Sequence, residues 1–255
     1  RSSSFPGYYG EKIVIRILDS IKGVKLLNDL GFSTLQMQHI REALGAPYGM
    51  VLISGPTGSG KTTTLYSMLN EIDRDHKNVV SLEDPVEYNV GGMNQSQVFP
   101  DIGYTFASGL RSILRQDPDV ILVGEIRDYE TAEVAIQAAL TGHLVLSTLH
   151  TNDAPSTVLR LMNMGVEAFL VASSVNTVVA QRLLRRVCTK CKEEYTIPAE
   201  KLIQLGFPQS KITGDTIKLS KGKGCQACGK SGYKGRVAVY EIMDMSTTIK
   251  ELILG

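Results

Sequence analysis

One glycine-rich segment restricts the possible fold more than any other feature of the sequence. It reads GPTGSGKT over residues 55–62 and matches G-x-x-x-x-G-K-[ST] at every fixed position. The short apolar run Met50–Ser54 leads directly into it, and a stretch with helical character follows. A strand, a tight glycine turn and a helix in this order indicate an α/β sheet with the loop at the carboxyl end of a strand.

The residue types in this loop suit the binding of phosphate groups. Glycines let the backbone turn tightly so that successive N–H groups point inward, and the following helix directs its positive end at the same anion. Lys61 can reach the β- and γ-phosphates, and the Thr62 hydroxyl can bind Mg²⁺. We predict a nucleoside triphosphate site formed by Gly55, Pro56, Thr57, Gly58, Ser59, Gly60, Lys61, Thr62 and Thr63.

Three further short apolar runs follow the loop, at Val79–Leu82, Val120–Val123 and Leu144–Leu149. Helical patterns lie between them at Thr105–Gln116 and Thr131–Ala139. Short buried strands that alternate with helices predict a mostly parallel sheet covered by helices on both faces.

The rest of the chain has weaker patterns. Residues Glu11–Asp19 alternate like a strand, and Thr34–Leu44 favours a helix. The region Pro155–Arg186 has a helical pattern that breaks near Gly165. From Cys188 onward turn residues and cysteines predominate, which indicates a small lobe that is inserted or appended.

Charge and hydropathy disfavour two classes of protein. The formal net charge is only +1, from 27 basic and 26 acidic residues, and the one short basic run is Arg182–Arg186. Direct nucleic-acid binding is therefore not expected. No run of 18 apolar residues is present, and we expect no transmembrane helix. Because the sequence opens at Arg1 without Met and ends at Gly255, we interpret it as part of a longer protein.

Two acidic segments follow predicted strands. Glu125 comes after Val120–Val123 and Gly124, where such enzymes usually carry Asp, and it could orient a water molecule or reach Mg²⁺ through water. Glu83, Asp84 and Glu87 follow another strand, with a stiffening proline between them. The alternative for each carboxylate is a solvated side chain on a loop.

Two histidines, His143 and His150, bracket the apolar run Leu144–Leu149. Either imidazole could sense a γ-phosphate by hydrogen bonding, although a lone histidine is more often a structural residue. The seven-residue separation puts the two side chains at opposite ends of a strand.

All four cysteines occur in two C-x-x-C pairs, which are Cys188, Cys191, Cys225 and Cys228. Four thiolates in two such pairs suit a tetrahedral structural Zn²⁺ site. The alternatives are four reduced thiols without metal and, with less support, a redox pair.

The order of these segments closely resembles the GspE/PilB family of secretion and pilus-extension ATPases. The resemblance rests on GPTGSGKTTTLY, LEDPVEY, LRSILRQDPDVILVGEIRDYETAEVAIQAALTGH and STLHTNDA, and it covers nearly the whole chain. In that family the motifs are called Walker A, Asp box, Walker B and His box. The family's Walker B also ends in Gly-Glu, like Gly124 and Glu125 here.

The resemblance implies a RecA-like core, a zinc element and a set of catalytic residues. The implied divisions are 1–19 (end of a preceding PAS-like domain), 20–33 (linker), 34–187 (ATPase core), 188–235 (zinc element) and 236–255 (truncated C-terminal segment). The implied catalytic residues are Glu125, Glu83, Glu87, His143 and His150, with two arginine fingers at Arg16 and Arg1.

The family also implies partners and a location. The implied assembly is a homo-hexameric ring that uses ATP, Mg²⁺ and Zn²⁺. The implied location is the cytoplasmic face of the inner membrane, and the implied partner there is an integral-membrane platform protein. Type IV pilus assembly is the expected role, and type II secretion is the alternative with the same chemistry. Retraction-type motors typically lack the cysteines. A nucleic-acid translocase and a nucleotide-sensing scaffold are the remaining alternatives.

Overall fold

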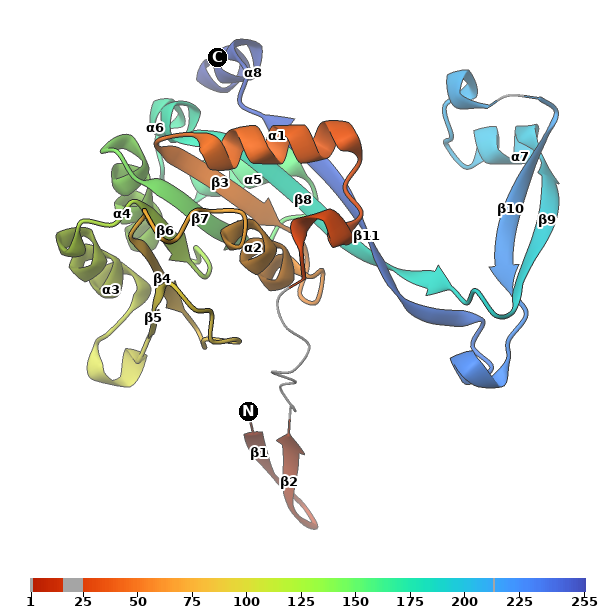
Figure 1. The fold of residues 1–255 in the computed structure, drawn as a ribbon, viewed down its shortest axis with the longest axis horizontal. Helices are drawn as coiled ribbons and strands as arrows, with labels where there is room; N and C mark the ends of the chain where they lie inside the picture. Colours follow the sequence, from red (N-terminus) through yellow and green to blue (C-terminus); the bar gives the residue numbers. More distant parts are fainter. Residues whose placement is uncertain (1, 16–24, 213) are drawn as a thin grey trace. The chain divides into compact units, whose positions relative to one another are not determined.

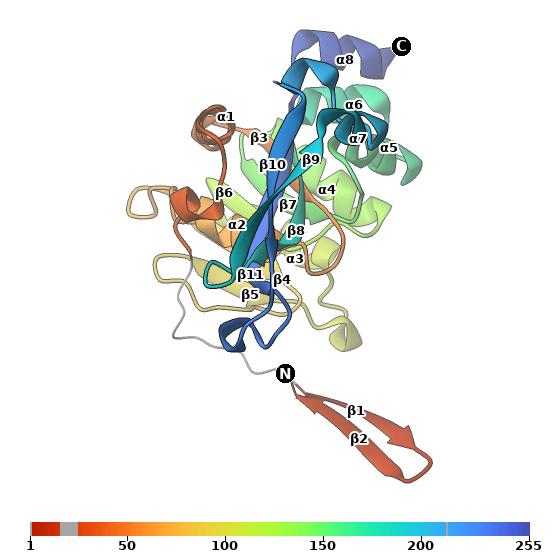
Figure 2. The same cartoon turned by 90° about the vertical axis from the view of Figure 1, so that its right-hand side faces the viewer.

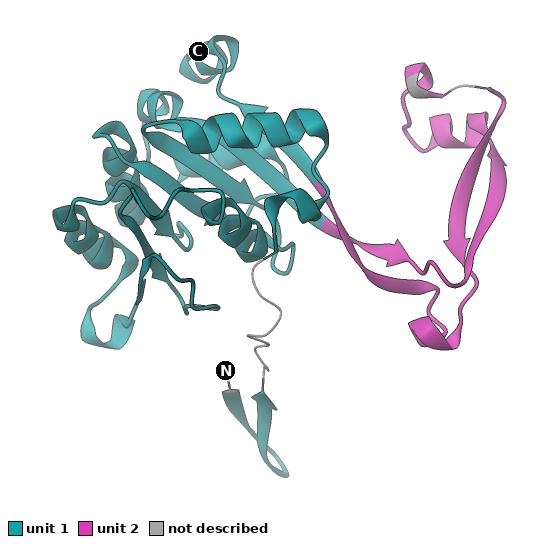
Figure 3. Cartoon of the chain, in the orientation of Figure 1, with its two compact units in different colours: residues 1–182, 240–255 teal, residues 183–239 magenta. Residues whose placement is uncertain are grey.

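The computed structural model describes residues 2–15, 25–212 and 214–255. These residues form two compact units, which Figure 3 distinguishes by colour. The first unit comprises 1–182 and 240–255, and the second comprises 183–239. The assignment of residues 1–19 to a separate preceding domain stays a prediction.

A seven-stranded sheet with the order β11-β8-β3-β7-β6-β4-β5 forms the centre of the first unit (Figure 1). Pairing is parallel between β3 and both β7 and β8, between β6 and both β4 and β7, and between β4 and β5. The strands are β3 (Gly49–Ser54), β4 (Val79–Glu83), β5 (Asn94–Gln97), β6 (Val120–Val123), β7 (Leu144–Leu149), β8 (Val175–Val187) and β11 (Tyr233–Asp244). This confirms the expected α/β fold with a mostly parallel sheet.

Every residue of β3, β4, β6 and β7 is buried, because helices cover both faces of the sheet. Successive residues of β3 belong to different core clusters: Leu52 is in the cluster that contains Leu110 and Ile136, whereas Ile53 is in the cluster that contains Ile40 and Leu69. Figure 2 shows α1 on one side of the sheet and α5 and α6 on the other. The helices of this unit are α1 (Thr34–Gly45), α2 (Lys61–Leu69), α3 (Phe106–Ile113), α4 (Tyr129–Leu140), α5 (Ala154–Asn163), α6 (Ala168–Ser174) and α8 (Thr247–Leu254).

Short 3₁₀ turns complete this unit, at η2 (Leu27–Leu30), η3 (Pro100–Ile102) and η4 (Leu114–Gln116). Leu27, which lies in the segment expected to be a linker, is fully buried in the cluster that contains Ile40 and Leu69. No helix among the described residues is long and apolar enough to cross a membrane.

The prediction of a helical region over Pro155–Arg186 is wrong in its second half. Helices α5 and α6 occupy the first half, and the break falls at Gly165, which has φ +105°. From Val175 the chain forms strand β8 instead. The β-branched run that includes Thr177, Val178 and Val179 packs well in a buried strand, and helix and strand cannot be separated by apolar periodicity alone in such a segment.

The N-terminal residues form an antiparallel hairpin of β1 (Ser2–Gly7) and β2 (Gly10–Ile15). This confirms a strand at the start of Glu11–Asp19, and the remainder of that segment lies outside the described residues.

The second unit contains a two-stranded antiparallel sheet of β9 (Lys192–Pro198) and β10 (Thr216–Gly222), in which Tyr195 is opposite Leu219. It also contains the helix α7 (Ala199–Gln204) and the turns η5 (Gln209–Lys211) and η6 (Gln226–Cys228). Ends of β8 and β11 connect it to the first unit in sequence.

Candidate functional site

The glycine-rich loop joins the end of β3 to the start of α2, as the sequence predicts. Gly58 and Gly60 have φ angles of +78° and +93°, which side chains with a Cβ rarely adopt. A Cβ at Gly55 would overlap the backbone oxygen of Gln181 and the side chain of Ser59. The loop therefore needs glycine at each of these three positions.

Lys61 turns its ammonium group into the loop. Its Nζ donates to the carbonyl oxygens of Gly55 at 2.8 Å and Pro56 at 3.3 Å, and it lies 3.5 Å from Nδ1 of His150. Burial lowers the pKa of Lys61, and the negative charge of Glu125 partly opposes that effect. A buried ammonium gains most from an anion placed beside it, which is what a phosphate group would supply.

The loop residues fit a phosphate ligand in two further respects. Among the described residues, the buried Ser59 hydroxyl lacks a hydrogen-bond partner, so a bound phosphate oxygen would satisfy it. Thr62, the second residue of α2, is exposed beside the helix N-terminus. Its hydroxyl is free of intrachain hydrogen bonds in the described part of the chain, as a magnesium ligand would require.

Glu125 and His150 meet near the loop because their strands, β6 and β7, are neighbours whose carboxyl ends lie at one edge of the sheet. Nε2 of His150 lies 3.4 Å from Oε2 of Glu125. The Glu125 side chain is 16% exposed and that of His150 is 49% exposed. With Lys61 on the other side of the imidazole, the three groups form a chain of contacts in which His150, the middle member, is the most exposed.

Arg127 completes this cluster, and the sequence interpretation missed it. Its Nη2 donates to Oε1 of Glu125 at 2.5 Å, and its Nη1 lies 3.8 Å from Oδ2 of Asp84. The hydrogen bond to Glu125 raises the pKa of Arg127. The sequence signal that could have identified Arg127 is its position two residues after Glu125, the acid that follows the buried strand β6.

Glu83 has a different environment from Glu125. It is 4% exposed and accepts hydrogen bonds from Tyr66, from Ser81 Oγ at 2.6 Å and from Gln95 Nε2 at 3.2 Å. Burial, together with the hydrogen bond to Glu83, raises the pKa of Tyr66. Three donors thus hold this carboxylate inside the unit, and its predicted catalytic role stays a prediction.

Among the described residues, Glu87 and His143 share no hydrogen bond or ion pair with the Lys61–His150–Glu125 cluster, and the two predicted arginines lie outside the described part of the chain. Glu87 is half-buried on the segment that follows β4. His143 precedes β7, at the opposite end of that strand from His150, and its Nδ1 lies 2.9 Å from the carbonyl oxygen of Ala138. Within one chain the structure does not bring His143 to the phosphate loop. Arg1 and Arg16 lie outside the described residues.

The four cysteines of the second unit come together in one cluster, in which all four sulfurs lie within 4.8 Å of one another. The Sγ atoms are 4.0 Å apart for Cys188 and Cys225, and 3.9 Å apart for Cys191 and Cys228. A tetrahedral zinc ion with bonds of about 2.3 Å separates its sulfur ligands by about 3.8 Å. The sulfurs therefore have the spacing that Zn²⁺ requires.

Backbone N–H groups point at these sulfurs. Gly224 N lies 3.3 Å from the sulfur of Cys191, and Cys225 N and Gly232 N lie 3.2 and 3.3 Å from that of Cys228. The Cys225 N–H lowers the pKa of Cys228 to about 6, whereas burial raises the pKa of Cys191 to about 12. Four thiolates at this spacing need a bound cation, which fits a zinc site.

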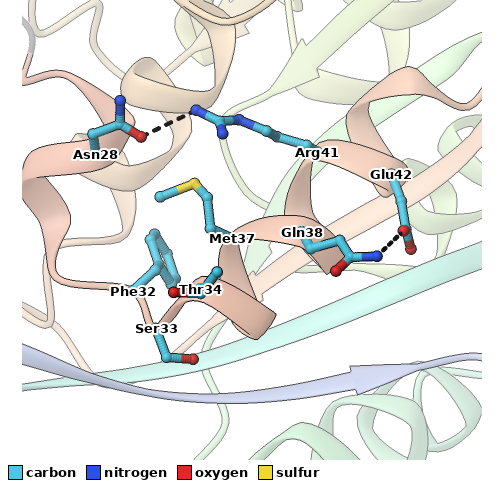
Figure 4. Close-up of a pocket in the computed structure, with 8 residues that line it drawn as sticks. All are labelled: Asn28, Phe32, Ser33, Thr34, Met37, Gln38, Arg41 and Glu42. Atoms are coloured by element: carbon cyan, nitrogen blue, oxygen red, sulfur yellow. Dashed lines mark hydrogen bonds between the residues drawn. The ribbon is translucent and has the colours of Figure 1, made fainter.

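A separate hollow of about 660 Å³ lies along α1 and the segment before it (Figure 4). No residue of the phosphate loop lines it, so it is distinct from the phosphate site. Its lining residues are Asn28, Phe32, Ser33, Thr34, Met37, Gln38, Arg41 and Glu42.

Comparisons with known proteins agree with this geometry. The chain is 52% identical over 256 residues to the type IV pilus assembly ATPase PilB of Myxococcus xanthus, and this covers 100% of the chain and 45% of the relative. It is 46% identical to the type II secretion system ATPase E of Vibrio cholerae, covering 99% and 50%. The chain thus spans about half the length of these curated relatives.

Solved structures support the fold. The pilus retraction motor PilT with bound ADP matches with a TM-score of 0.71 and 30% identity, covering 99% of this chain and 62% of that one. The Legionella pneumophila ATPase DotB matches with a TM-score of 0.68 at 23% identity, which bears on the fold alone. The model of the family described as "Type II/IV secretion system protein" matches residues 1–255. The chain belongs to the type II/IV secretion system protein family.

Proposed function

We propose that this chain is the ATP-hydrolysing part of a motor subunit that drives type IV pilus assembly. The observation that carries the proposal is the cluster of Lys61, His150 and Glu125 beside the glycine loop. The loop N–H groups and Lys61 bind the phosphates of ATP, and Thr62 binds Mg²⁺. The magnesium ion, when bound, neutralises charge on the phosphate oxygens.

Glu125 takes the role of positioning the attacking water. The water oxygen forms a bond to the γ-phosphorus, the bond to the ADP oxygen breaks, and the Glu125 carboxylate accepts the water proton. Arg127 supports this role because its hydrogen bond to Oε1 fixes the orientation of that carboxylate. His150, between Glu125 and Lys61, is placed to contact the γ-phosphate and to report its presence.

Pilus assembly is preferred over type II secretion because of the sequence relatives. Four type IV pilus assembly ATPases are 48–52% identical to the chain, and four type II secretion proteins are 45–46% identical. A type II secretion ATPase is the second candidate, with the same chemistry. The experiment is complementation of one strain that lacks its pilus-assembly ATPase and one that lacks its secretion ATPase, with surface pili and secreted enzyme as readouts.

The proposal includes the assembly in which the motor works. We place the protein in a homo-hexamer at the cytoplasmic face of the inner membrane, against an integral-membrane platform protein, with Arg16 and Arg1 as arginine fingers. A structural Zn²⁺ bound by the four cysteines stabilises the second unit. The names of the relatives, which are pilus assembly and secretion ATPases, and the family model support a role in such machinery.

Steady-state ATP turnover of the purified protein that contains this chain tests the activity itself. We expect Mg²⁺-dependent turnover that single-stranded DNA leaves unchanged. Turnover that requires DNA would instead favour a nucleic-acid translocase, and ATP binding without turnover would favour a nucleotide-sensing scaffold.

A further inference from the structure

A glutamine on β8, Gln181, lies directly against the phosphate loop. Strand β8 pairs in parallel with β3, and Ala180 is opposite Ser54, the last residue of β3. Gln181 is therefore the first residue beyond the paired end of β3, at the level where the loop begins. It is 3% exposed.

The side-chain amide of Gln181 connects the last part of the glycine turn to the first turn of α2. Its Nε2 donates to the carbonyl oxygen of Ser59 at 2.9 Å, and its Oε1 accepts from Thr64 Oγ1 at 2.9 Å. Thr64 lies in the first turn of α2, where its N–H donates to Gly60. The buried amide thus has a partner on each side, which fixes its orientation.

The bond to Ser59 has a consequence for the neighbouring peptide N–H. In a planar trans peptide, the carbonyl oxygen of Ser59 and the N–H of Gly60 point in opposite directions. Because Gln181 holds the Ser59 oxygen, the Gly60 N–H is directed away from the Gln181 side chain. Gly60 directly precedes Lys61, which turns its ammonium group into the loop.

We propose that Gln181 is a positioning residue that holds the Ser59–Gly60 peptide and the first turn of α2 ready to bind the diphosphate of a nucleotide. This proposal rests on the proposed nucleotide site and deepens it. A diphosphate is common to ADP and ATP, so loss of the Gln181 amide weakens binding of both nucleotides to the same degree. It leaves the chemical step nearly unchanged, because Gln181 touches neither Glu125 nor His150.

The test compares Gln181→Met, which keeps the length of the side chain and removes both hydrogen bonds, with the wild type. Direct titration of ADP and of MgATP onto the purified protein gives Kd, and steady-state turnover gives KM and kcat. We expect Kd for ADP and ATP, and KM, to rise about tenfold together, with kcat within about threefold of wild type. The matched control Gln137→Met changes an exposed glutamine on α4 and leaves all four values unchanged.

A second pair of variants keeps the proposal falsifiable if Gln181→Met does not fold. Thr64→Val removes the hydroxyl that donates to Gln181, whereas Thr64→Ser keeps it. We expect Thr64→Val to bind ADP several-fold more weakly than Thr64→Ser. Where Gln181→Met does fold, the losses in ADP affinity from Thr64→Val and Gln181→Met should be less than additive when the two are combined.

Three results would overturn the proposal. These are wild-type ADP affinity in a folded Gln181→Met, a fall in kcat with unchanged Kd, or equal ADP affinity in Thr64→Val and Thr64→Ser. Nucleotide binding is measured independently of turnover. A wild-type protein that binds ADP without hydrolysing ATP would therefore contradict the proposed activity and still test Gln181.

Discussion

The imidazole Nε2 of His150 lies 3.4 Å from the carboxylate Oε2 of Glu125. The two residues are 25 positions apart in sequence and meet because β6 and β7 are paired in parallel, with Val123 opposite Ser147. The same imidazole faces Lys61 through Nδ1. A side chain in this position connects the phosphate-binding group with the group that positions water.

Removal of the His150 imidazole should slow turnover more than it weakens binding. We expect His150→Ala to lower kcat about a hundredfold, the size of effect seen when one positioned hydrogen-bonding group is removed from an active site. ADP affinity should stay within about threefold, since the glycine loop is intact. His76→Ala, which changes an exposed histidine paired with Asp73, is the control and should have wild-type kcat. Equal effects of the two variants would remove His150 from the mechanism.

The hydrogen bonds to the buried carboxylate of Glu83 should contribute to the stability of the fold. Tyr66→Phe removes one of its three donors, and both side chains are buried. We expect the free energy of unfolding, from urea denaturation, to fall by about 1–3 kcal/mol. Tyr129→Phe is the matched control, because the Tyr129 hydroxyl donates to Oε1 of Glu133 at 3.2 Å in an exposed hydrogen bond. This variant should change the free energy of unfolding by less than about 0.5 kcal/mol. A loss of the same size in both variants would contradict the assigned role of Tyr66.

Zinc should be bound with a stoichiometry of one ion per chain. We expect Cys191→Ser, or a strong chelator, to release it and to expose backbone amides of residues 188–232 in hydrogen exchange, because structural zinc contributes directly to folding free energy. Amides of the buried strand β3 should keep their protection. Thr189→Ser, an exposed change between the first two cysteines, should retain the ion. A protein isolated without zinc whose second unit is nevertheless well protected would contradict the assignment.

Asp153, the N-cap of α5, should make the stability of the fold depend on pH. Its carboxylate accepts from the Ser156 N–H at 2.7 Å. Hydrogen bonding from the Ser156 side chain, followed by that from the Ser156 N–H, lowers the pKa of Asp153 below its ordinary 3.8. The folded protein therefore favours the ionised carboxylate of Asp153. The stabilisation of the folded state is fully present above the pKa of Asp153 in the unfolded chain, and it is lost as the pH falls through the lower pKa of Asp153 in the folded protein.

The measurement is the difference in Tm between wild type and Asp153→Ala, followed from pH 7 to below pH 3.8. We expect wild type to be the more stable protein at pH 7 and the difference to shrink as the pH falls below 3.8. Asp101→Ala, in the turn η3, should show little difference at either pH. A difference that is constant with pH would exclude the carboxylate as its source.

The parts of the fold that could be predicted are those in which a short sequence pattern determines the environment. Strands β3, β6 and β7 are continuous apolar runs and are fully buried. The glycine loop specifies its own backbone angles, so its position between β3 and α2 followed directly. Glu125 follows β6 and His150 follows β7 at the same sheet edge, so strand pairing brings together two residues that the sequence singled out, and their catalytic role stays a prediction.

Other parts depend on partners that are distant in sequence. Strand β8 has an apolar run that suits a helix equally well until β3 is beside it. The burial of Glu83 depends on Tyr66 and Gln95, neither of which a local acidic motif reveals. Gln181 is 122 positions from Ser59, and only the pairing of strands places the two together.

The most direct measurement of the central claim is a comparison of wild type with Glu125→Gln, which keeps the shape of the side chain and removes its ability to accept a proton. MgATP affinity and steady-state ATP turnover should both be measured on the purified protein. We predict that Glu125→Gln binds MgATP with nearly wild-type affinity while its kcat falls at least about a hundredfold. Turnover near the wild-type rate in a variant that binds MgATP normally would contradict the account, because it would show that Glu125 does not position the attacking water.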